Sequence, residues 1–439
     1  MKKIVPLLVI VSLTLSGFVG LTNGYRITDH SCIDDSIDMV IIAPELFSSN
    51  IQPLIKHKNC YEIVTILKTV ESIYDEYDGR DEPEQIKYFI KDAIEEWNIN
   101  YVLIIGSKNF IPMRKTTGRV WLYQGNINLP TDHYYSDIYN ENRSFSSWDT
   151  NNNDRFGEFR WDDIWDHNWD NHTIDFVDLY PDVIVGRLPC ETKFEVSLVV
   201  NRIISYETQT FGKNWFKKIV LMGGDTSTYS GSQVFEGELV NDLVAQELEP
   251  YGFSSTRLWT STNTFKPFFI NFEISKGAGF VCYSGHGFDN GIATYPPHGN
   301  VTVNYITPYL LGLLNINKLP IVFLDACLTS NPEYSKKFLG MQIPCFAWSI
   351  VKKSFGGAIA SIGATQRAYT YRSSGIPQAG SSKLCITFYG TYEEGVSLGQ
   401  MFFNTQNEYL DNVGRDYYTI EEFVLLGDPS LKVGGYPLI

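Results

Sequence analysis

The sequence lacks clusters of basic residues. Its 439 residues include 35 Lys and Arg against 50 Asp and Glu, which gives a formal net charge of −15. Binding to nucleic acid requires clustered basic side chains that neutralise phosphates. The composition therefore argues against a nucleic-acid partner and indicates an acidic protein.

The sequence also lacks cysteines at the spacing of a metal site. Seven cysteines are scattered along the chain without a CxxC pair, which argues against a zinc knuckle. No HExxH pattern is present, so His167 and His172 are interpreted as surface polar residues rather than zinc ligands. The odd cysteine count leaves at least one thiol without a partner in the same chain.

Beyond the N-terminus, no apolar run is long enough to cross a bilayer. Residues 1–24 combine two lysines, an apolar stretch and small residues, in the order of a secretory signal peptide. An uncleaved membrane anchor is the alternative for this segment. We expect a mature chain that is secreted or at the cell surface and has no stable insertion in a membrane.

Apolar runs alternate with helical patterns along most of the chain. The runs that predict buried strands are 38–43, 101–106, 181–188, 217–224, 279–285, 319–327 and 357–364. The patterns that predict helices are centred on 86–97, 194–204, 235–248, 305–314 and 345–351. This alternation predicts an α/β fold of mainly parallel sheets flanked by helices. We place the boundary between its two subdomains, 25–214 and 215–439, near Asn214. Residues 107–178 break the pattern and are predicted to be a long polar loop region.

Two predicted strands end in residues of a nucleophilic site. "GFVCYSGHG" ends in His286 between two glycines, and "LPIVFLDAC" ends in Cys327. If these strands are parallel neighbours, both side chains emerge at the same edge of the sheet. A thiol with an imidazole within hydrogen-bond reach is the arrangement of a cysteine nucleophile and its base. The backbone N–H groups of Gly287 and Cys327 are the candidates for holding an oxyanion.

The order "YSGHG" and then "DAC" resembles the gingipain-like cysteine peptidases of the caspase-like clan. The segments "VLIIGSKNFIPMR", "DHYYSDIY", "VIVGRLP" and "LLGDPSLKV" extend the resemblance over roughly residues 38–433, whereas the caspase pattern QACxG is absent. The resemblance implies a caspase-like fold and hydrolysis of proteins or peptides. It also implies that His286 is the general base and Cys327 the nucleophile.

The resemblance implies two acidic site residues. Gingipains orient the histidine with an acidic residue at an earlier strand end, and Asp225 occupies the equivalent place; the alternative is that Asp225 only caps a turn or helix. Gingipains also carry an acidic residue that pairs with Arg or Lys of the substrate, and a gapless count from Asp225 reaches Glu236. The alternatives are that Glu236 stabilises the first turn of a helix, or that Glu238 takes the role.

The segment "WDTNNNDRFGEFRWDD" resembles a calcium loop. Asp149, Asn151 and Asn153 stand at alternate positions, as the first oxygen ligands of such loops do. Glu158 or Asp162 would complete the set, because Arg160 stands where a bidentate glutamate is expected. The sequence predicts a structural calcium ion here, with a solvated polar loop as the alternative, and no cofactor for catalysis.

These observations support a secreted cysteine endopeptidase that acts through an acyl-enzyme. Its main competitor is a catalytically silent extracellular binding or adhesion protein on the same scaffold, since fold alone does not give activity. A metal-dependent hydrolase that uses the Asp- and His-rich loop is the third hypothesis.

Overall fold

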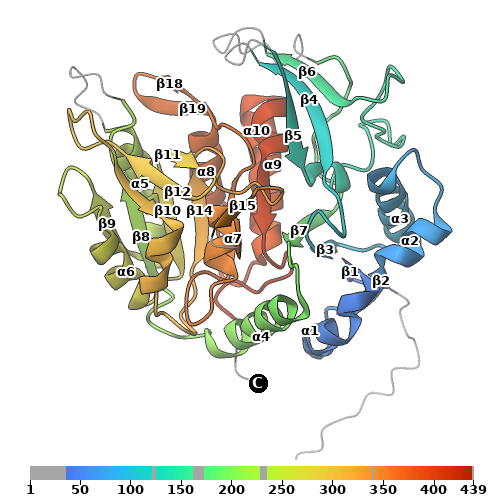
Figure 1. The fold of residues 1–439 in the computed structure, drawn as a ribbon, viewed down its shortest axis with the longest axis horizontal. Helices are drawn as coiled ribbons and strands as arrows, with labels where there is room; N and C mark the ends of the chain where they lie inside the picture. The colour runs from blue at the N-terminus through green and yellow to red at the C-terminus, as the bar shows by residue number, and fades with distance from the viewer. Residues whose placement is uncertain (1–35, 121–124, 162–172, 228–234, 339–340, 438–439) are drawn as a thin grey trace, which may run out of the picture. The chain divides into compact units, whose positions relative to one another are not determined.

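The computed structural model describes residues 36–120, 125–161, 173–227, 235–338 and 341–437 (Figure 1). The predicted signal peptide, residues 1–24, lies outside the described residues. The same holds for Asp162, His167 and His172. Among the helices of the described ranges, none is long and apolar enough to cross a membrane.

A ten-stranded sheet lies at the centre of the fold, in the order β2-β1-β3-β7-β20-β17-β14-β10-β8-β9. Its strands are β1 (Met39–Ala43), β2 (Thr65–Thr69), β3 (Tyr101–Ile105), β7 (Ile184–Leu188), β8 (Lys218–Gly223), β9 (Ser254–Trp259), β10 (Phe280–Ser284), β14 (Ile321–Asp325), β17 (Ala360–Ala364) and β20 (Phe423–Leu426). All neighbouring strands are parallel except β17 and β20, which are antiparallel. The sheet therefore consists of two parallel half-sheets that run in opposite directions.

The sequence accounts for the central strands. Every residue of β1, β10, β14 and β17 is buried. Strands covered by helices on both faces are continuous apolar runs rather than alternating ones, and these four segments have that pattern. The predicted α/β fold with a mainly parallel sheet is confirmed.

Helices flank the sheet on both faces (Figure 1). They are α1 (Ser48–Cys60), α2 (Val70–Glu76), α3 (Glu82–Trp97), α4 (Lys193–Gln209), α5 (Glu236–Leu248), α6 (Pro267–Ser275), α7 (Phe346–Val351), α8 (Ser381–Gly390), α9 (Leu398–Val413) and α10 (Tyr417–Glu422). Helices α5, α8 and α9 contact one another in a row, and α5 packs on β8 and β10. Helix α7 packs on β17 and β20, whereas α4 packs on α1.

The boundary predicted near Asn214 falls between α4 and β8, where the chain passes from one half-sheet to the other. The described residues nevertheless belong to one compact unit. Strand β20 comes from the C-terminal range but has the direction of the N-terminal half-sheet. It joins the two halves into one sheet.

The polar region 107–178 contains more regular structure than its sequence indicates. Strands β4 (Arg114–Val120), β5 (Gly125–Thr131) and β6 (Phe156–Trp161) form a separate sheet in the order β5-β4-β6. Its buried residues include Phe156 and Phe159. The prediction of a long loop was wrong here, because these strands carry polar and small residues whose short apolar alternation is hard to detect.

The helix predicted around 305–314 is also absent. Strands β11 (His286–Phe288), β12 (Gly291–Thr294) and β13 (Val303–Ile306) form a small antiparallel sheet, and the 3-10 helix η6 (Thr307–Gly312) follows it. Tyr305, Leu310 and Leu313 are buried, as the apolar spacing predicted. Burial alone does not distinguish a short strand and a 3-10 turn from an α-helix.

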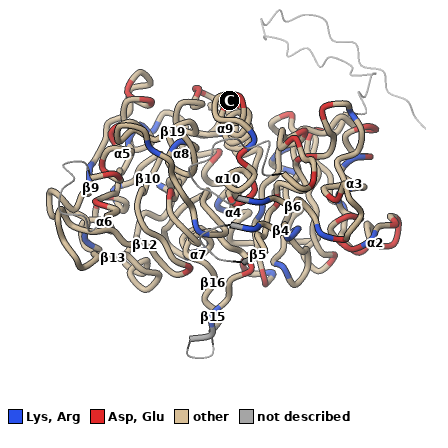
Figure 2. The backbone as a smooth tube through the Cα atoms, turned by 90° about the horizontal axis from the view of Figure 1, so that it is seen from above, with Lys and Arg blue, Asp and Glu red and all other residues tan. Residues whose placement is uncertain are grey.

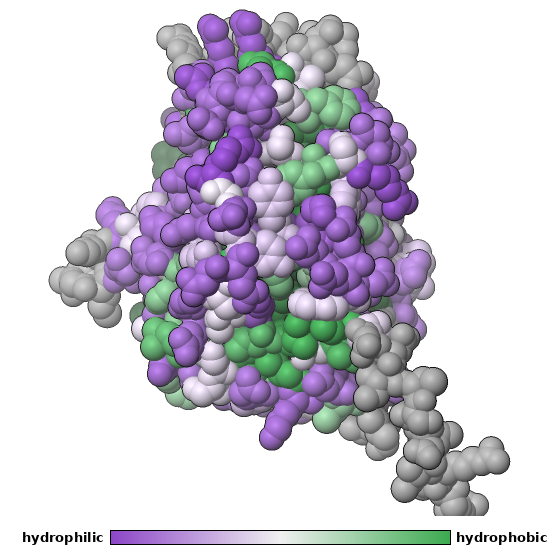
Figure 3. All heavy atoms as spheres, turned by 90° about the vertical axis from the view of Figure 1, so that its right-hand side faces the viewer, coloured by the Kyte–Doolittle hydropathy of each residue, from purple (hydrophilic) through white to green (hydrophobic). Residues whose placement is uncertain are grey.

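Basic and acidic residues are interspersed along the backbone, and the hairpin of β15 (Ser335–Phe338) and β16 (Met341–Pro344) projects from it (Figure 2). Figure 3 shows a patch of hydrophobic residues on one side of the molecule. The patch lies level with the edge strand β2 and helix α1 of Figure 1. Exposed apolar residues near these elements include Leu46 and Val64.

Candidate active site

The two predicted reactive residues follow neighbouring strands. Strands β10 and β14 are parallel, and their last residues, Ser284 and Asp325, are directly paired. The chain then continues to His286 and Cys327 at the same edge of the sheet. The adjacency predicted from two strand ends is confirmed, although β11 to β13 and η6 connect the strands in place of the expected helix.

Gly287 allows the histidine segment to approach the cysteine segment closely. A Cβ atom at position 287 would lie 2.3 Å from the carbonyl oxygen of Cys327, far inside contact distance. The glycine is therefore required by the contact between these two backbones. An oxyanion role for the N–H groups of Gly287 and Cys327 stays a prediction.

Cys327 lies at a strained turn. Leu328, the next residue, has a φ of 61°, a left-handed conformation that is uncommon for a residue with a bulky side chain. The thiol is half-buried, and its Sγ donates to the carbonyl of Ala368 at 3.5 Å. Burial raises the pKa of the Cys327 thiol to about 11, and the negative charge of Glu422 adds to this effect.

The imidazole of His286 is exposed and is fixed by the backbone. Its Nε2 lies 2.9 Å from the carbonyl oxygen of Thr226, and its ring makes an edge contact with Tyr295. Because a carbonyl oxygen only accepts hydrogen bonds, Nε2 must carry the proton. The neutral ring therefore has its free lone pair on Nδ1, where a base would take a proton.

Cys327 and His286 line one cavity of about 180 Å³ without bonding to each other. Within the described residues, the thiol bonds only to Ala368 and the imidazole only to Thr226. The predicted thiol–imidazole hydrogen bond is not formed in this state. The raised pKa of Cys327 agrees with that, since an adjacent imidazolium would lower it.

Asp225 is wholly buried and pairs with Tyr295 through an isolated β-bridge. Its Oδ1 accepts a hydrogen bond from the N–H of Ser227 at 2.9 Å. Burial raises the pKa of Asp225, and the neighbouring carboxyl of Glu236 raises it further. The contact with His286 comes from Thr226, so the orienting role of the Asp225 carboxylate stays a prediction.

Glu236 begins helix α5, as the alternative interpretation of its position predicted. Its Oε2 accepts from both the backbone N–H and the hydroxyl of Thr226, each at 3.0 Å. Although burial acts to raise the pKa of Glu236, these bonds lower it. The structure thus places Glu236 behind Thr226 and outside the lining of the cavity. Glu238 is also turned away, with its carboxylate bonded to Ser261.

Several cavity residues were not predicted. Asp325 is buried, and its Oδ2 accepts from the hydroxyls of Ser284 and Ser382 at 2.7 Å each. These bonds tie the ends of β10 and β14 to the start of α8. Arg372 also lines the cavity, from β18 (Thr370–Ser373). The polar residues that end the strands were visible in the sequence, whereas nothing in it linked Arg372 to this place.

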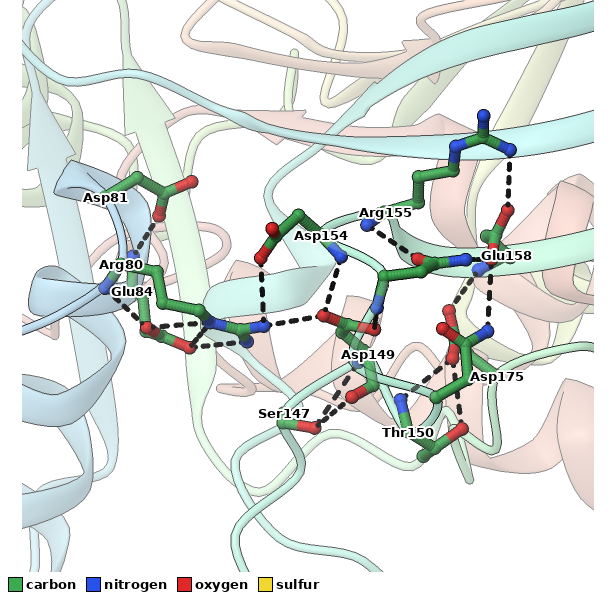
Figure 4. A network of polar contacts seen from close by, with 12 residues as sticks. Arg80, Asp81, Glu84, Ser147, Asp149, Thr150, Asp154, Arg155, Glu158 and Asp175 are labelled. Atoms are coloured by element: carbon green, nitrogen blue, oxygen red, sulfur yellow. Dashed lines mark hydrogen bonds and ion pairs between the residues drawn. The ribbon is translucent and has the colours of Figure 1, made fainter.

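The predicted calcium loop is held by a guanidinium (Figure 4). Arg80 Nη1 donates to Asp149 Oδ2 at 2.6 Å, and the backbone N–H groups of Asn153 and Asp154 bond to the same carboxylate. The amide Nδ2 atoms of Asn151 and Asn153 both donate to Glu158 Oε2. No cluster of three or more His, Cys, Asp or Glu among the described residues could hold a metal ion. The carboxylates of Asp149 and Glu158 thus have donors from the protein itself. Calcium at this loop stays a prediction.

The fold and the cavity define an α/β protein with a cysteine and a histidine at adjacent strand ends, which is the layout of a caspase-like cysteine peptidase. The chain belongs to peptidase family C25, whose profile matches residues 33–434. The resemblance to gingipain-like cysteine peptidases is confirmed.

Individual relatives are similar over nearly the whole chain. Gingipain R2 of Porphyromonas gingivalis is 21% identical over 424 residues, which are 93% of this chain and 48% of that protein. Gingipain R1 of Porphyromonas gingivalis is 22% identical over 408 residues, 90% of this chain and 34% of that protein. The chain thus spans about half or less of the length of these curated relatives.

Solved structures share the fold. The complex of the pro- and mature domains of Porphyromonas gingivalis RgpB has a TM-score of 0.64 at 20% identity, over 90% of this chain and 79% of that one. The crystal structure of the Arg-specific cysteine proteinase gingipain R has a TM-score of 0.62 at 20% identity, over 91% and 79%. At this identity the likeness establishes the fold and leaves activity to be argued from the site.

Proposed function

We propose that this chain is a secreted cysteine endopeptidase that hydrolyses protein or peptide substrates through an acyl-enzyme. One observation carries the proposal: Cys327 and His286 follow paired parallel strands and line the same cavity. Membership of a peptidase family supports it. The pattern of residues 1–24 supports an extracellular location.

The chemistry begins with rotation of the thiol away from Ala368 toward the imidazole. His286 Nδ1 takes the thiol proton, and the thiolate attacks the carbonyl carbon of the substrate. The C–N bond then breaks, and the leaving amine receives the proton from His286. Water, deprotonated by the same imidazole, hydrolyses the thioester and restores the thiol. Thr226 holds the ring in the required tautomer throughout.

A preference for cleavage after basic residues was predicted through Glu236. The name of one structural relative states specificity for Arg. In this chain the Glu236 carboxylate is bonded to Thr226 and does not line the cavity. The proposed function therefore includes no basic preference from this residue.

A second candidate is the catalytically silent binding protein. Two observations favour it: the raised pKa of the Cys327 thiol and the missing bond to His286. Both describe the chain without substrate, and hydrogen bonds of catalytic groups often tighten only in the complex. The filled positions of nucleophile and base favour the enzyme.

The deciding experiment compares peptide hydrolysis by the wild-type chain and Cys327→Ala. We expect cleavage by the wild type and a loss of several orders of magnitude in the variant, because only background catalysis remains without a nucleophile. Cys345→Ala is the matched control, since Cys345 is buried outside the cavity. Equal activity of Cys327→Ala and wild type would overturn the mechanism, and inactivity of all three proteins would favour the binding protein.

A further inference from the structure

Arg372 is a charged residue of the cavity that the proposed mechanism does not use. It lies in β18, which forms a hairpin with β19 (Ile376–Gly380), and it lines the cavity together with Cys327 and His286. A side chain at this place is within the reach of a substrate that occupies the cavity.

The backbone at Arg372 is irregular. Tyr371 pairs with Ala379 and Arg372 with Pro377, so the register shifts here and Gln378 on the opposite strand β19 is the extra residue. Bulges occur next to active sites, where they redirect a side chain away from the direction of a regular strand. The irregular pairing lies directly opposite Arg372, which itself lines the cavity.

One nitrogen of the Arg372 guanidinium, the buried Nε, has no hydrogen-bond partner among the described residues. A buried donor without a partner carries a desolvation cost. A carboxylate bound in the cavity would pair with the positive charge of the guanidinium, and bidentate pairing is the preferred geometry of Arg with carboxylates.

The other charged groups of the cavity do not satisfy Arg372. Asp325 is 4% exposed, and its Oδ2 is bonded to the hydroxyls of Ser284 and Ser382. Thr370 Oγ1 is engaged with Ser382 at 2.8 Å. His286 bonds to Thr226 and carries no negative charge in either protonation state. Among the described residues, the cavity thus combines hydroxyl groups and the hydrogen-bonded carboxylate of Asp325 with the guanidinium of Arg372, for which no ion pair is formed.

We propose that Arg372 determines specificity by binding the side-chain carboxylate of an Asp or Glu in the substrate, next to the bond that is cleaved. This inference rests on the proposed function. It differs from the sequence prediction of a basic preference, because Arg372 lines the cavity and Glu236 does not.

The test uses three peptides that differ only on the amino side of the scissile bond, with Asp, its isostere Asn, or Lys. We expect kcat/KM of the wild type to be roughly 10- to 100-fold higher for Asp than for Asn, the range of a charge-assisted hydrogen bond. Arg372→Gln is expected to bring this ratio close to one, and Arg372→Lys to keep part of it. The control is Arg257→Gln on β9, outside the cavity lining, which leaves the ratio unchanged.

A binding measurement separates this inference from the proposed function. In the Cys327→Ala background, calorimetry compares Kd for the Asp and Asn peptides with and without Arg372→Gln. Tighter binding of the Asp peptide that depends on Arg372 supports the inference even if no peptide is cleaved. Equal Kd values, or wild-type cleavage of Asn and Lys peptides as fast as Asp, would overturn it and leave the peptidase proposal untouched.

Discussion

At the residue scale, the histidine is oriented by a relay that ends in a backbone carbonyl. Glu236 accepts two bonds from Thr226, and the carbonyl of Thr226 accepts from His286 Nε2. A carboxylate that acts through Thr226 still fixes the imidazole ring of His286 and its tautomer. It does not place a negative charge directly on the imidazole, as a carboxylate in direct contact would.

This relay predicts different effects for two substitutions of Glu236. Glu236→Ala removes the oxygen that accepts both hydrogen bonds of Thr226. It is expected to lower kcat about tenfold or more with little change in KM, because the base loses its position. Glu236→Gln keeps one oxygen that can accept, so most of kcat should remain. Steady-state kinetics of both variants check this, with circular dichroism as the control of folding. A shift of substrate preference toward neutral residues in Glu236→Gln would instead support the sequence prediction of a specificity role.

The thiol of Cys327 gives a pH prediction at the same scale. With a pKa of about 11, only about one molecule in 10,000 carries the thiolate at pH 7. The rate of alkylation by iodoacetamide should therefore rise about tenfold per pH unit from 7 to 10. The measurement needs a Cys60→Ser background, because Cys60 is the exposed cysteine among the described ones.

The contrary outcome of this titration is equally informative. A rate that is already level between pH 6 and 9 would mean that the thiolate is paired with an imidazolium in the free chain. The additional substitution His286→Ala would then abolish the plateau. In that case the resting geometry around Ala368 is not the dominant one in solution.

How much of the site the sequence could predict depends on how each residue acts. His286 and Cys327 were predictable because their side-chain chemistry is specific and each follows an apolar strand. Thr226 and Ala368 act through carbonyl oxygens, which every residue has, so residue type carries no signal. Arg372 reaches the cavity through a hairpin whose register no local pattern defines.

At the element scale, most buried strands were predictable, whereas the buried strand β20 and the edge or polar strands were not predicted. The apolar runs of β1, β3, β10 and β14 predicted strands close to the observed bounds. Strands β2 and β9 lie at the two edges of the sheet and are only partly buried. Their sequences mix polar and apolar residues, so burial provides a weaker pattern there.

The loop around Asp149 gives a prediction at this scale. Arg80 connects the loop to Glu84 at the start of α3, and the side chains of both acids are almost fully buried. Arg80→Ala leaves these carboxylates without their cation and is expected to destabilise the fold by about 1 to 3 kcal/mol, less than for a fully buried pair because Arg80 is 34% exposed. Thermal unfolding measures the loss. Arg155→Ala is the control, because Arg155 is 58% exposed and its contact with Glu158 is longer, 3.4 Å.

Chelation separates the guanidinium from the predicted calcium ion. If Arg80 alone balances the negative charge of the loop around Asp149, excess EGTA leaves the Tm of the wild type unchanged. Added calcium is then expected to restore part of the stability of Arg80→Ala, since the freed carboxylates would accept it. A Tm of the wild type that falls in EGTA would support the calcium prediction.

At the scale of the whole molecule, buried charges join its two halves. Lys58 on α1 bonds to Glu207 on α4 at 2.8 Å and to Asp428, which follows β20, at 2.7 Å. All three side chains are fully buried. His57 and the backbone N–H of Lys432 also bond to Glu207. The N-terminal helix pair and the strand that joins the half-sheets are thus held by one cation.

Lys58→Met is expected to cost about 3 to 5 kcal/mol of unfolding free energy at pH 7, because it leaves two buried carboxylates without their cation. Urea unfolding measures this cost. Lys217→Met is the matched control: its pair with Glu394 is partly exposed, and its loss should cost about 0 to 1 kcal/mol.

The same variant should reverse the sign of one contribution to the pH dependence. Although burial acts to raise the pKa of Glu207, Lys58 and the bonds to His57 hold it below its ordinary value in the wild type. Glu207 therefore contributes stability above its unfolded pKa, near 4.3, and this contribution is lost as the pH falls through the folded pKa.

Without Lys58, burial raises the folded pKa of Glu207 above the unfolded one, so the contribution of Glu207 to stability grows as the pH falls from 7 toward 5. The difference in unfolding free energy between wild type and Lys58→Met should thus shrink from pH 7 to pH 5. A difference that stays constant over this range would mean that His57 and the N–H of Lys432 hold Glu207 ionised without the lysine.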